Sequence, residues 1–218
     1  MPILENHPIT SPWLQPGASR GLLVITDTAP TEEVLIRLQQ VLAAGVRLVQ
    51  LRLPGLDDRH YSAVATPAMA MSRQVGACLL LNCSATLANR LGADGIHLSA
   101  RRLAESTERP LSRLGCVAAS CHNVHELVLA QRMGVDFAVL SPVLSTTSHP
   151  GAPTLGWARF GALVANAGIP LYALGGMTPD QVPLAQAHGA QGVAVLSAVW
   201  HATDIGQAIR AYTAEQGV

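Results

Sequence analysis

The stretch HGAQGVAVLS (residues 188–197) places a glycine after a helix-like segment and before a short, largely apolar run. The same pattern occurs in AGVRLVQLR (44–52), LGADGIHLS (91–99) and MGVDFAVLS (133–141). Glycine is favoured just past the end of a helix because it reaches the left-handed conformation without steric cost. Each stretch is therefore interpreted as a junction between a helix and the next strand, and four junctions indicate an alternating chain.

Eight short apolar runs are candidates for the strands of this alternating chain. Near-continuous apolar runs are typical of parallel strands that are buried on both faces. The predicted strands are LLVITD (22–27), VRLVQLR (46–52), ACLLLN (77–82), GIHLS (95–99), LGCVAAS (114–120), DFAVLS (136–141), IPLYAL (169–174) and GVAVLS (192–197). The predicted helices cover 31–44, 58–74, 84–91, 100–107, 123–133, 157–167, 178–187 and 198–215. Eight such units favour a single (β/α)8 TIM barrel with parallel strands over an open doubly wound sheet.

Length and composition fit one domain that follows a short arm. The chain has 218 residues, 49% of them apolar, and its 14 basic side chains balance 14 acidic ones. Residues 1–20 contain several prolines and no continuous apolar segment, so we interpret them as an N-terminal arm and residues 21–218 as the barrel. The balanced charge argues against binding to nucleic acid or to a membrane. We expect a cytoplasmic protein with reduced, buried cysteines, and the sequence is compatible with a homo-oligomer.

Polar residues lie at the carboxyl ends of several predicted strands, where the active site of a TIM barrel forms. Two glycines also end the predicted seventh strand, in YALGGMTPD (172–180), where Thr178 and Pro179 have the composition of a helix start. In this fold a phosphate commonly binds in the loops after strands seven and eight. Glycine backbone N–H groups and a helix start attract anions, so we predict that Gly175, Gly176 and Ser197 bind a phosphate group, with Ser197 as an N-cap.

The segments LLVITD, VQLR, DGIHLS, SCH, SPVLSTTSHPGAPTLG, ALGGMTPD and GVAVLSAVW occur in the order and spacing of the thiamine-phosphate synthase and TenI superfamily. The resemblance covers almost all of residues 21–200. It is closest to the synthase-like domain that is fused to Nudix (MutT-type) hydrolases in some proteobacteria. It implies a TIM barrel of thiamine biosynthesis that binds a phosphorylated small molecule, with a Nudix hydrolase as a protein partner.

The resemblance also implies roles for individual residues. Synthases of this family join a hydroxymethylpyrimidine diphosphate to a thiazole phosphate, with Mg²⁺ steadying the departing diphosphate. Contacts with the pyrimidine diphosphate fall on Gln50, Arg52 and Asn82. The remaining substrate contacts fall on Ser120, Thr146, Ser148, Gly176, Leu196 and Ser197.

Four positions depart from the family pattern. The lysine of the family after strand two is Pro54 here, the aspartate beside Asn82 is Cys83, the aspartate after strand four is Arg102, and the lysine after strand six is His149. We keep His149 as a candidate substrate-binding residue. Because Mg²⁺ prefers carboxylate and phosphate oxygens, we predict no metal ligand and no cofactor, with Mg²⁺ needed only if synthase activity is retained.

These departures favour a TenI-like thiazole tautomerase, which aromatises a carboxythiazole phosphate by moving protons. The resemblance assigns the acid and base role to His122, and Ser120 and Arg52 are further candidate catalytic residues. A thiamine-phosphate synthase and a non-catalytic phosphate-binding domain associated with a Nudix hydrolase are the alternatives. From the residues alone, His122 can instead cap the following helix or bind a backbone group, Arg52 can form a structural ion pair, and His97 is interpreted as a satisfied core histidine.

Overall fold

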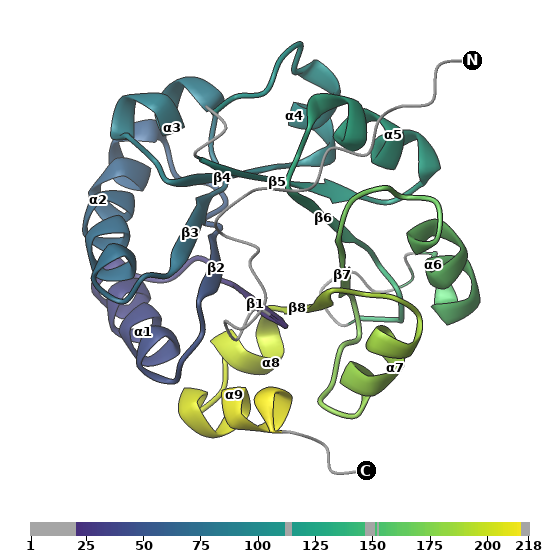
Figure 1. Cartoon of the computed structure of the whole chain (residues 1–218). Helices are drawn as coiled ribbons and strands as arrows, with labels where there is room; N and C mark the ends of the chain where they lie inside the picture. Colours follow the sequence, from purple (N-terminus) through teal and green to yellow (C-terminus); the bar gives the residue numbers. More distant parts are fainter. Residues whose placement is uncertain (1–20, 112–114, 147–150, 152, 215–218) are drawn as a thin grey trace.

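The computed structural model describes residues 21–111, 115–146, 151 and 153–214, and over these ranges the strands form a closed parallel barrel (Figure 1). The ring closes where the last strand pairs with the first, through Leu23 and Ala194 among other pairs. The predicted TIM barrel is thus confirmed. The strands are β1 (Leu22–Ile25), β2 (Leu48–Leu51), β3 (Cys78–Leu81), β4 (Gly95–Leu98), β5 (Cys116–Cys121), β6 (Phe137–Leu140), β7 (Leu171–Leu174) and β8 (Gly192–Val195).

The helices surround this ring on its outer side (Figure 1). They are α1 (Thr31–Ala43), α2 (Asp58–Gln74), α3 (Ala85–Leu91), α4 (Ala100–Glu105), α5 (Val124–Met133), α6 (Gly156–Val164), α7 (Gln181–Ala187), α8 (Ser197–Trp200) and α9 (Ile205–Thr213).

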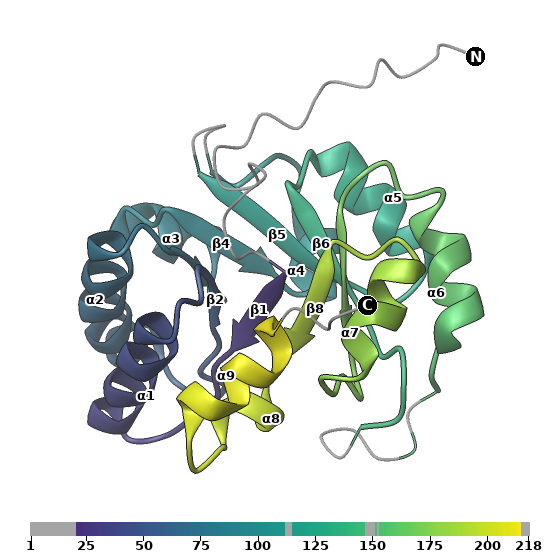
Figure 2. The same ribbon diagram turned by 60° about the horizontal axis from the view of Figure 1, so that its bottom comes forward.

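The last predicted helix, 198–215, is wrong because the chain forms two helices there. Asp204 caps the start of α9, and its carboxylate accepts a hydrogen bond from the Gln207 N–H at 2.7 Å. The chain turns between the two helices, and α9 packs beside α1, as Figure 2 shows.

The glycines of the helix-to-strand junctions behave as predicted. Gly92 and Gly134 occupy the left-handed C-cap positions of α3 and α5. Gly45 and Gly189 follow the C-cap residues of α1 and α7 by one position and also have positive φ angles. The junctions that predict the barrel are therefore glycine-dependent turns.

The strands separate two apolar layers. Side chains on the inner face fill the barrel, among them Leu23, Leu48, Phe137 and Tyr172. Side chains on the outer face pack against the helices. Because side chains alternate between the two faces of a strand, the inner set identifies which polar residues at the strand ends point into the barrel.

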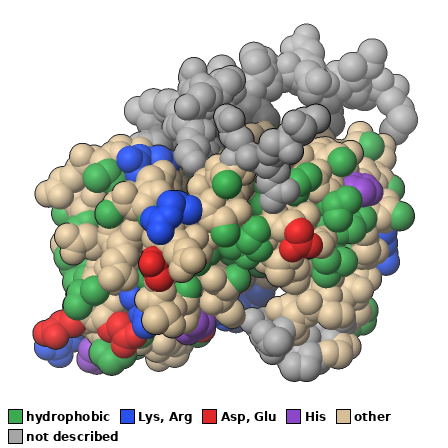
Figure 3. Space-filling model, turned by 90° about the horizontal axis from the view of Figure 1, so that it is seen from below, with side chains coloured by type: hydrophobic (Ala, Val, Ile, Leu, Met, Phe, Trp, Pro, Cys, Tyr) green, Lys and Arg blue, Asp and Glu red, His purple; other side chains and the backbone are tan. Residues whose placement is uncertain are grey.

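The surface combines charges of both signs, and acidic and basic side chains are interspersed on the face shown in Figure 3. In the described part of the chain, no helix is both long and apolar enough to cross a membrane. All four cysteines are buried and free of disulfide bonds, as predicted. The predicted N-terminal arm, residues 1–20, lies outside the described residues.

Candidate functional site

A layer of polar side chains occupies the inner face at the carboxyl ends of β2 to β5. Gln50 lies two residues after Leu48, which belongs to the inner apolar set, and is only 4% exposed. Asn82 and Ser120 follow inner residues of β3 and β5 by the same spacing, and His97 pairs in register with Ala118 of that set. Four residues from four consecutive strands therefore face the same end of the barrel.

His97 is the centre of this layer. Its Nε2 lies 2.8 Å from Ser120 Oγ, and its carbonyl oxygen accepts a hydrogen bond from Asn82 Nδ2 at 3.1 Å. The side chain is 1% exposed, and burial lowers the pKa of His97 to about 3, so the imidazole is neutral at physiological pH. Nδ1 has no hydrogen-bond partner in the described structure. The sequence predicts a core histidine whose ring nitrogens both have hydrogen-bond partners. This is wrong for Nδ1, although Nε2 does have a partner.

Sequence reasoning therefore missed His97 as a functional candidate. A buried polar atom without a partner carries a free-energy cost, which a polar ligand group can offset. One signal in the sequence could have identified His97. It lies near the end of the predicted strand GIHLS, which directly precedes the strand that carries Ser120.

Arg52 is held at the barrel end by contacts between β1 and β2. Thr26, fully buried, donates through Oγ1 to the Arg52 carbonyl at 3.0 Å and accepts from the Arg52 N–H at 2.9 Å. The guanidinium lies 3.5 Å from Asp27 Oδ1, with side chains 38% and 32% exposed. The other Asp27 oxygen lies 3.6 Å from His201 Nε2. Arg52 thus forms an ion pair with Asp27, which is the structural role that the sequence left open for it.

His122 follows β5 and is fixed by its neighbours on both sides. Its ring Nδ1 lies 2.8 Å from the Ser141 carbonyl oxygen, which can only accept, so Nδ1 carries the proton and Nε2 has the lone pair in the neutral ring. Its backbone N–H donates to Glu126 at 2.7 Å, and Asn123, not His122, caps α5. In the described part of the chain, Nε2 makes no hydrogen bond.

Gly175 and Gly176 both have positive φ angles, +99° and +69°, and lie against the loop that follows β6. A Cβ on Gly176 would lie 2.7 Å from both Leu144 Cβ and Ser145 O. The Leu144 N–H donates to the Gly175 carbonyl at 3.1 Å, which fastens the two loops together. The close approach that requires glycine here comes from the protein itself. Among the described residues, the Gly176 N–H has no acceptor.

Two predicted helix starts are wrong. Thr178 and Pro179 precede α7, which begins only at Gln181, because the chain first makes a turn with the Gln181 N–H donating to the Thr178 carbonyl at 2.9 Å. Ser197 is the first residue of α8 rather than its cap, and Leu196 occupies the N-cap position without a side-chain hydrogen bond. Neither position therefore forms the side-chain-capped helix start that the sequence predicts.

The predicted site residues lie in two groups around the ring. The group at the carboxyl ends of β2 to β5, or directly after them, is Gln50, Arg52, Asn82, Ser120 and His122. The group that follows β6 to β8 is Thr146, Gly175, Gly176, Leu196 and Ser197. His122 joins the groups, because its ring binds Ser141 at the end of β6. Ser148 and His149 lie outside the described residues.

Fold and site together define a parallel (β/α)8 barrel with a polar carboxyl end and a double-glycine turn after β7. A family model described as thiamine monophosphate synthase matches residues 22–199, and the chain belongs to this family.

Individual relatives agree with this assignment. A thiamine-phosphate synthase of Thermus thermophilus is 34% identical over 181 residues, covering 83% of this chain and 87% of the relative. One from Thioalkalivibrio sulfidiphilus is 32% identical over 189 residues, covering 85% and 90%. The solved structure of a thiamine phosphate pyrophosphorylase from Pyrococcus furiosus superposes with a TM-score of 0.72 at 22% identity, covering 88% of this chain and 92% of that one. The structural likeness concerns the fold.

The residues at the two carboxylate positions of the family pattern do not fit a magnesium ion. Cys83 is buried, and burial raises the pKa of its thiol to about 11, so the sulfur stays protonated and is a poor ligand for a hard cation. Arg102 carries a positive charge, which repels a metal ion. Within the described ranges, no group of three or more His, Cys, Asp or Glu side chains could hold a metal.

Proposed function

We propose that this protein joins a pyrimidine diphosphate to a thiazole phosphate, the activity for which its relatives are named. The observation that carries the proposal is the polar layer on the inner faces of β2 to β5, which lies at the same end of the barrel as the loops after β6 to β8. The polar layer of β2 to β5 suits a polar heteroaromatic ring, and the loops after β6 to β8 suit a phosphate. The names of the relatives support this alternative better than the tautomerase that the sequence favours.

The inner layer supplies the groups that would orient the pyrimidine. The carboxamide of Gln50 offers both a donor and an acceptor, which match a ring nitrogen and its amino substituent. Asn82 uses its Nδ2 on the His97 carbonyl, which leaves its side-chain oxygen to accept from a ligand. Burial keeps these contacts in a medium of low dielectric, where polar recognition is strong.

The double-glycine turn would bind the phosphate of the thiazole. The Gly176 N–H has no acceptor in the described structure, and the loop is held in place from outside by Tyr212, whose hydroxyl donates to the Met177 carbonyl at 2.8 Å. A rigid loop with an available N–H binds a phosphate oxygen without first having to reorganise. The thiazole ring would then lie over the barrel end, facing the pyrimidine.

A coupling assay with purified protein tests the proposal. We expect thiamine phosphate and pyrophosphate to form in equal amounts from the two substrates, and Gln50→Ala to lower the rate at least tenfold. Arg132→Gln, on the outer surface of α5, is the control and should retain the wild-type rate. If wild-type protein forms no thiamine phosphate above the buffer background, the proposed coupling is wrong.

A second candidate, the thiazole tautomerase, is favoured by the geometry of His122. Its Nδ1–H is bound to a carbonyl, so its Nε2 is oriented as a base. Histidine exchanges protons readily near neutral pH. The two candidates differ in their products, because tautomerisation releases no pyrophosphate.

A Nudix hydrolase partner stays part of the proposal and rests only on the resemblance of the loop after β6 to fused domains. Co-elution of this barrel with such a hydrolase in gel filtration would support it, and separate elution at micromolar concentration would contradict it.

A further inference from the structure

A basic groove lies on the outer side of the barrel between α3 and α4, which are neighbours around the ring (Figure 1). Its volume is about 370 Å³, and Ser84, Arg101, Arg102 and Glu105 are among the residues that line it. Ser84 caps α3, and Arg101 lies in the first turn of α4. These two helix starts follow β3 and β4 directly, so Ser84 and Arg101 lie on the side of the barrel where the polar layer lies, and the groove continues along α4 to Glu105.

Arg102 is the unusual residue of this groove. It is half-buried, and within the described residues its guanidinium forms no ion pair or hydrogen bond. The acidic residue of the groove, Glu105, lies 4.0 Å from Arg101 instead, and both of those side chains are largely exposed. Asp58, the acidic residue at the start of α2, pairs with Arg90 at 3.6 Å.

The buried neighbours of Arg102 do not neutralise it. Burial raises the pKa of Cys83 to about 11 and raises that of Tyr61 still further, while the nearby positive charge of Arg102 opposes both shifts only in part. Both groups are thus uncharged at physiological pH, and the Tyr61 hydroxyl donates to the Leu51 carbonyl at 2.8 Å. A guanidinium that is partly removed from water beside neutral groups is available for an anion from outside.

We propose that Arg102, assisted by Arg101, binds the diphosphate group of the substrate directly and occupies the place that a metal ion has in the family. The inference deepens the proposed function, because it assigns the diphosphate end of the same substrate. The inference follows because Mg²⁺ prefers oxygen ligands, whereas the two positions hold the neutral thiol of Cys83 and the positive guanidinium of Arg102. A guanidinium can hold two phosphate oxygens at once through its parallel N–H groups.

The chemistry of this step balances without a metal or a redox partner. The C–O bond between the pyrimidine methylene and the diphosphate breaks, and both of its electrons leave with the diphosphate oxygen. The thiazole nitrogen supplies the electron pair of the new C–N bond. Arg102 would stabilise the negative charge that develops on the leaving oxygen, as positive groups do in other phosphoryl sites.

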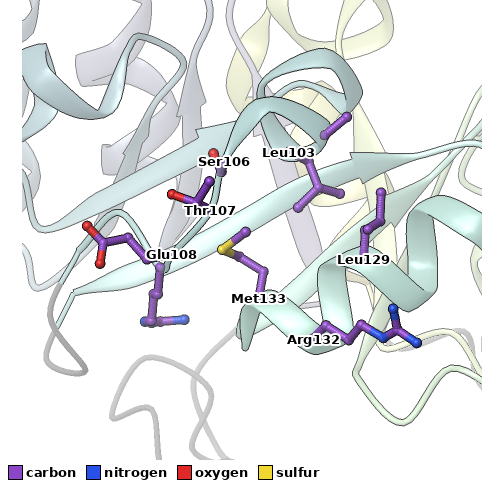
Figure 4. Close-up of a pocket in the computed structure, with 9 residues that line it drawn as sticks. Leu103, Ser106, Thr107, Glu108, Leu129, Arg132 and Met133 are labelled. Carbon is purple, nitrogen blue, oxygen red and sulfur yellow. The ribbon is translucent and has the colours of Figure 1, made fainter.

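The test is calorimetric titration with inorganic pyrophosphate in the presence of EDTA. Wild-type protein should bind pyrophosphate without Mg²⁺ and more tightly than orthophosphate, and Arg102→Gln should weaken the binding at least tenfold. The control is Arg132→Gln, which removes the same charge from a separate hollow of about 240 Å³ between α4 and α5 (Figure 4) and should bind as wild type does. Thermal melts of each variant would establish that it is folded.

Three results would overturn the inference: an unchanged affinity in Arg102→Gln, equal affinity for orthophosphate, or binding that appears only when Mg²⁺ is added. The double variant Cys83→Asp with Arg102→Asp provides a second measurement, because restored carboxylates should make pyrophosphate binding depend on Mg²⁺. A parallel titration with thiazole phosphate separates this inference from the proposed function. If wild-type protein does not bind thiazole phosphate, the coupling activity alone is contradicted. If Arg102→Gln binds pyrophosphate as tightly as wild type does, the anion groove alone is contradicted.

Discussion

The imidazole Nε2 of His97 and the hydroxyl oxygen of Ser120 lie 2.8 Å apart across β4 and β5. This hydrogen bond joins a fully buried, neutral histidine to a residue that faces the proposed substrate. One proton is shared between the two atoms, so the orientation of the Ser120 hydroxyl depends on the tautomer of His97. His97 would therefore orient Ser120 if Ser120 contacts the substrate, and the burial of His97 also has a consequence for stability.

Stability should depend on pH through His97. Below about pH 6.5 the unfolded chain protonates this histidine, whereas the folded chain does not do so until about pH 3. The unfolded state then binds more protons, so the free energy of unfolding falls as the pH drops through this window. Between pH 7.5 and pH 5.0 the loss from this group is about 2 kcal/mol.

Urea unfolding of wild type and His97→Gln at the two pH values measures this loss. The variant should lose less stability on acidification than the wild type does. His125→Gln, which changes an exposed histidine of α5, is the control and should behave as wild type. An identical pH dependence in His97→Gln and wild type would show that His97 titrates normally.

Gly176→Ala should destabilise the fold more than a glycine substitution in an open turn. The new Cβ would meet Leu144 and Ser145 at 2.7 Å, in addition to the strain of a φ angle of +69°. Strain of this kind costs about 1–2 kcal/mol, and crowding adds about 1–3 kcal/mol. Gly55→Ala, at φ +87° with open space around it, isolates the first of these costs. Equal unfolding midpoints for the two variants would mean that the loop after β6 moves aside freely.

Arg109→Ala should destabilise the barrel strongly. Arg109 Nη2 donates to Asp136 Oδ2 at 2.7 Å, the side chains are only 17% and 11% exposed, and the same oxygen accepts from the Val117 N–H at 2.7 Å. Removing the arginine leaves a buried carboxylate without its charge partner, which costs about 3–5 kcal/mol.

The exposed pair of Arg73 and Asp94 offers a matched comparison, at 2.5 Å with side chains 50% and 33% exposed. Arg73→Ala should cost less than about 1 kcal/mol. Chemical unfolding of both variants measures the difference, and similar losses would contradict the role assigned to burial.

The sequence was sufficient for the barrel because its signals are local. Each junction glycine follows its own helix, and each apolar run is a strand, so the periodic pattern of residues 44–52 or 188–197 needs no distant contact to be understood. Helix starts were less predictable. Thr178 and Pro179 have the composition of a helix start, yet the turn before Gln181 depends on how the loop after β7 is held by Tyr212, far along the chain.

The site could be predicted only as a set of strand ends. Sequence spacing placed Gln50, Asn82 and Ser120 at one end of the barrel, and the structure adds that they share its inner face. The tight packing of Gly176 on Leu144 and the unpartnered Nδ1 of His97 are contacts between distant segments. Such contacts leave no periodic trace in the sequence.

His122→Asn tests the second candidate function. The asparagine amide can still donate to the Ser141 carbonyl, so the polar shape beside β6 is kept while the proton-carrying Nε2 is lost. A general acid or base of this kind contributes about 10²- to 10⁴-fold to the rate, so kcat for the thiazole tautomer should fall by that factor. The affinity for thiazole phosphate should change little, because the proposed binding site of its phosphate is the glycine turn after β7.

The measurement is tautomerase turnover together with a binding titration for wild type, His122→Asn and the control His125→Gln. The control removes a histidine from the exposed side of α5 and should keep the wild-type kcat. Equal turnover in wild type and His122→Asn would leave His122 with only its structural bond to Ser141. A wild type that does not turn over the thiazole tautomer would contradict the tautomerase, and the coupling reaction and the non-catalytic phosphate-binding domain would be the remaining candidates.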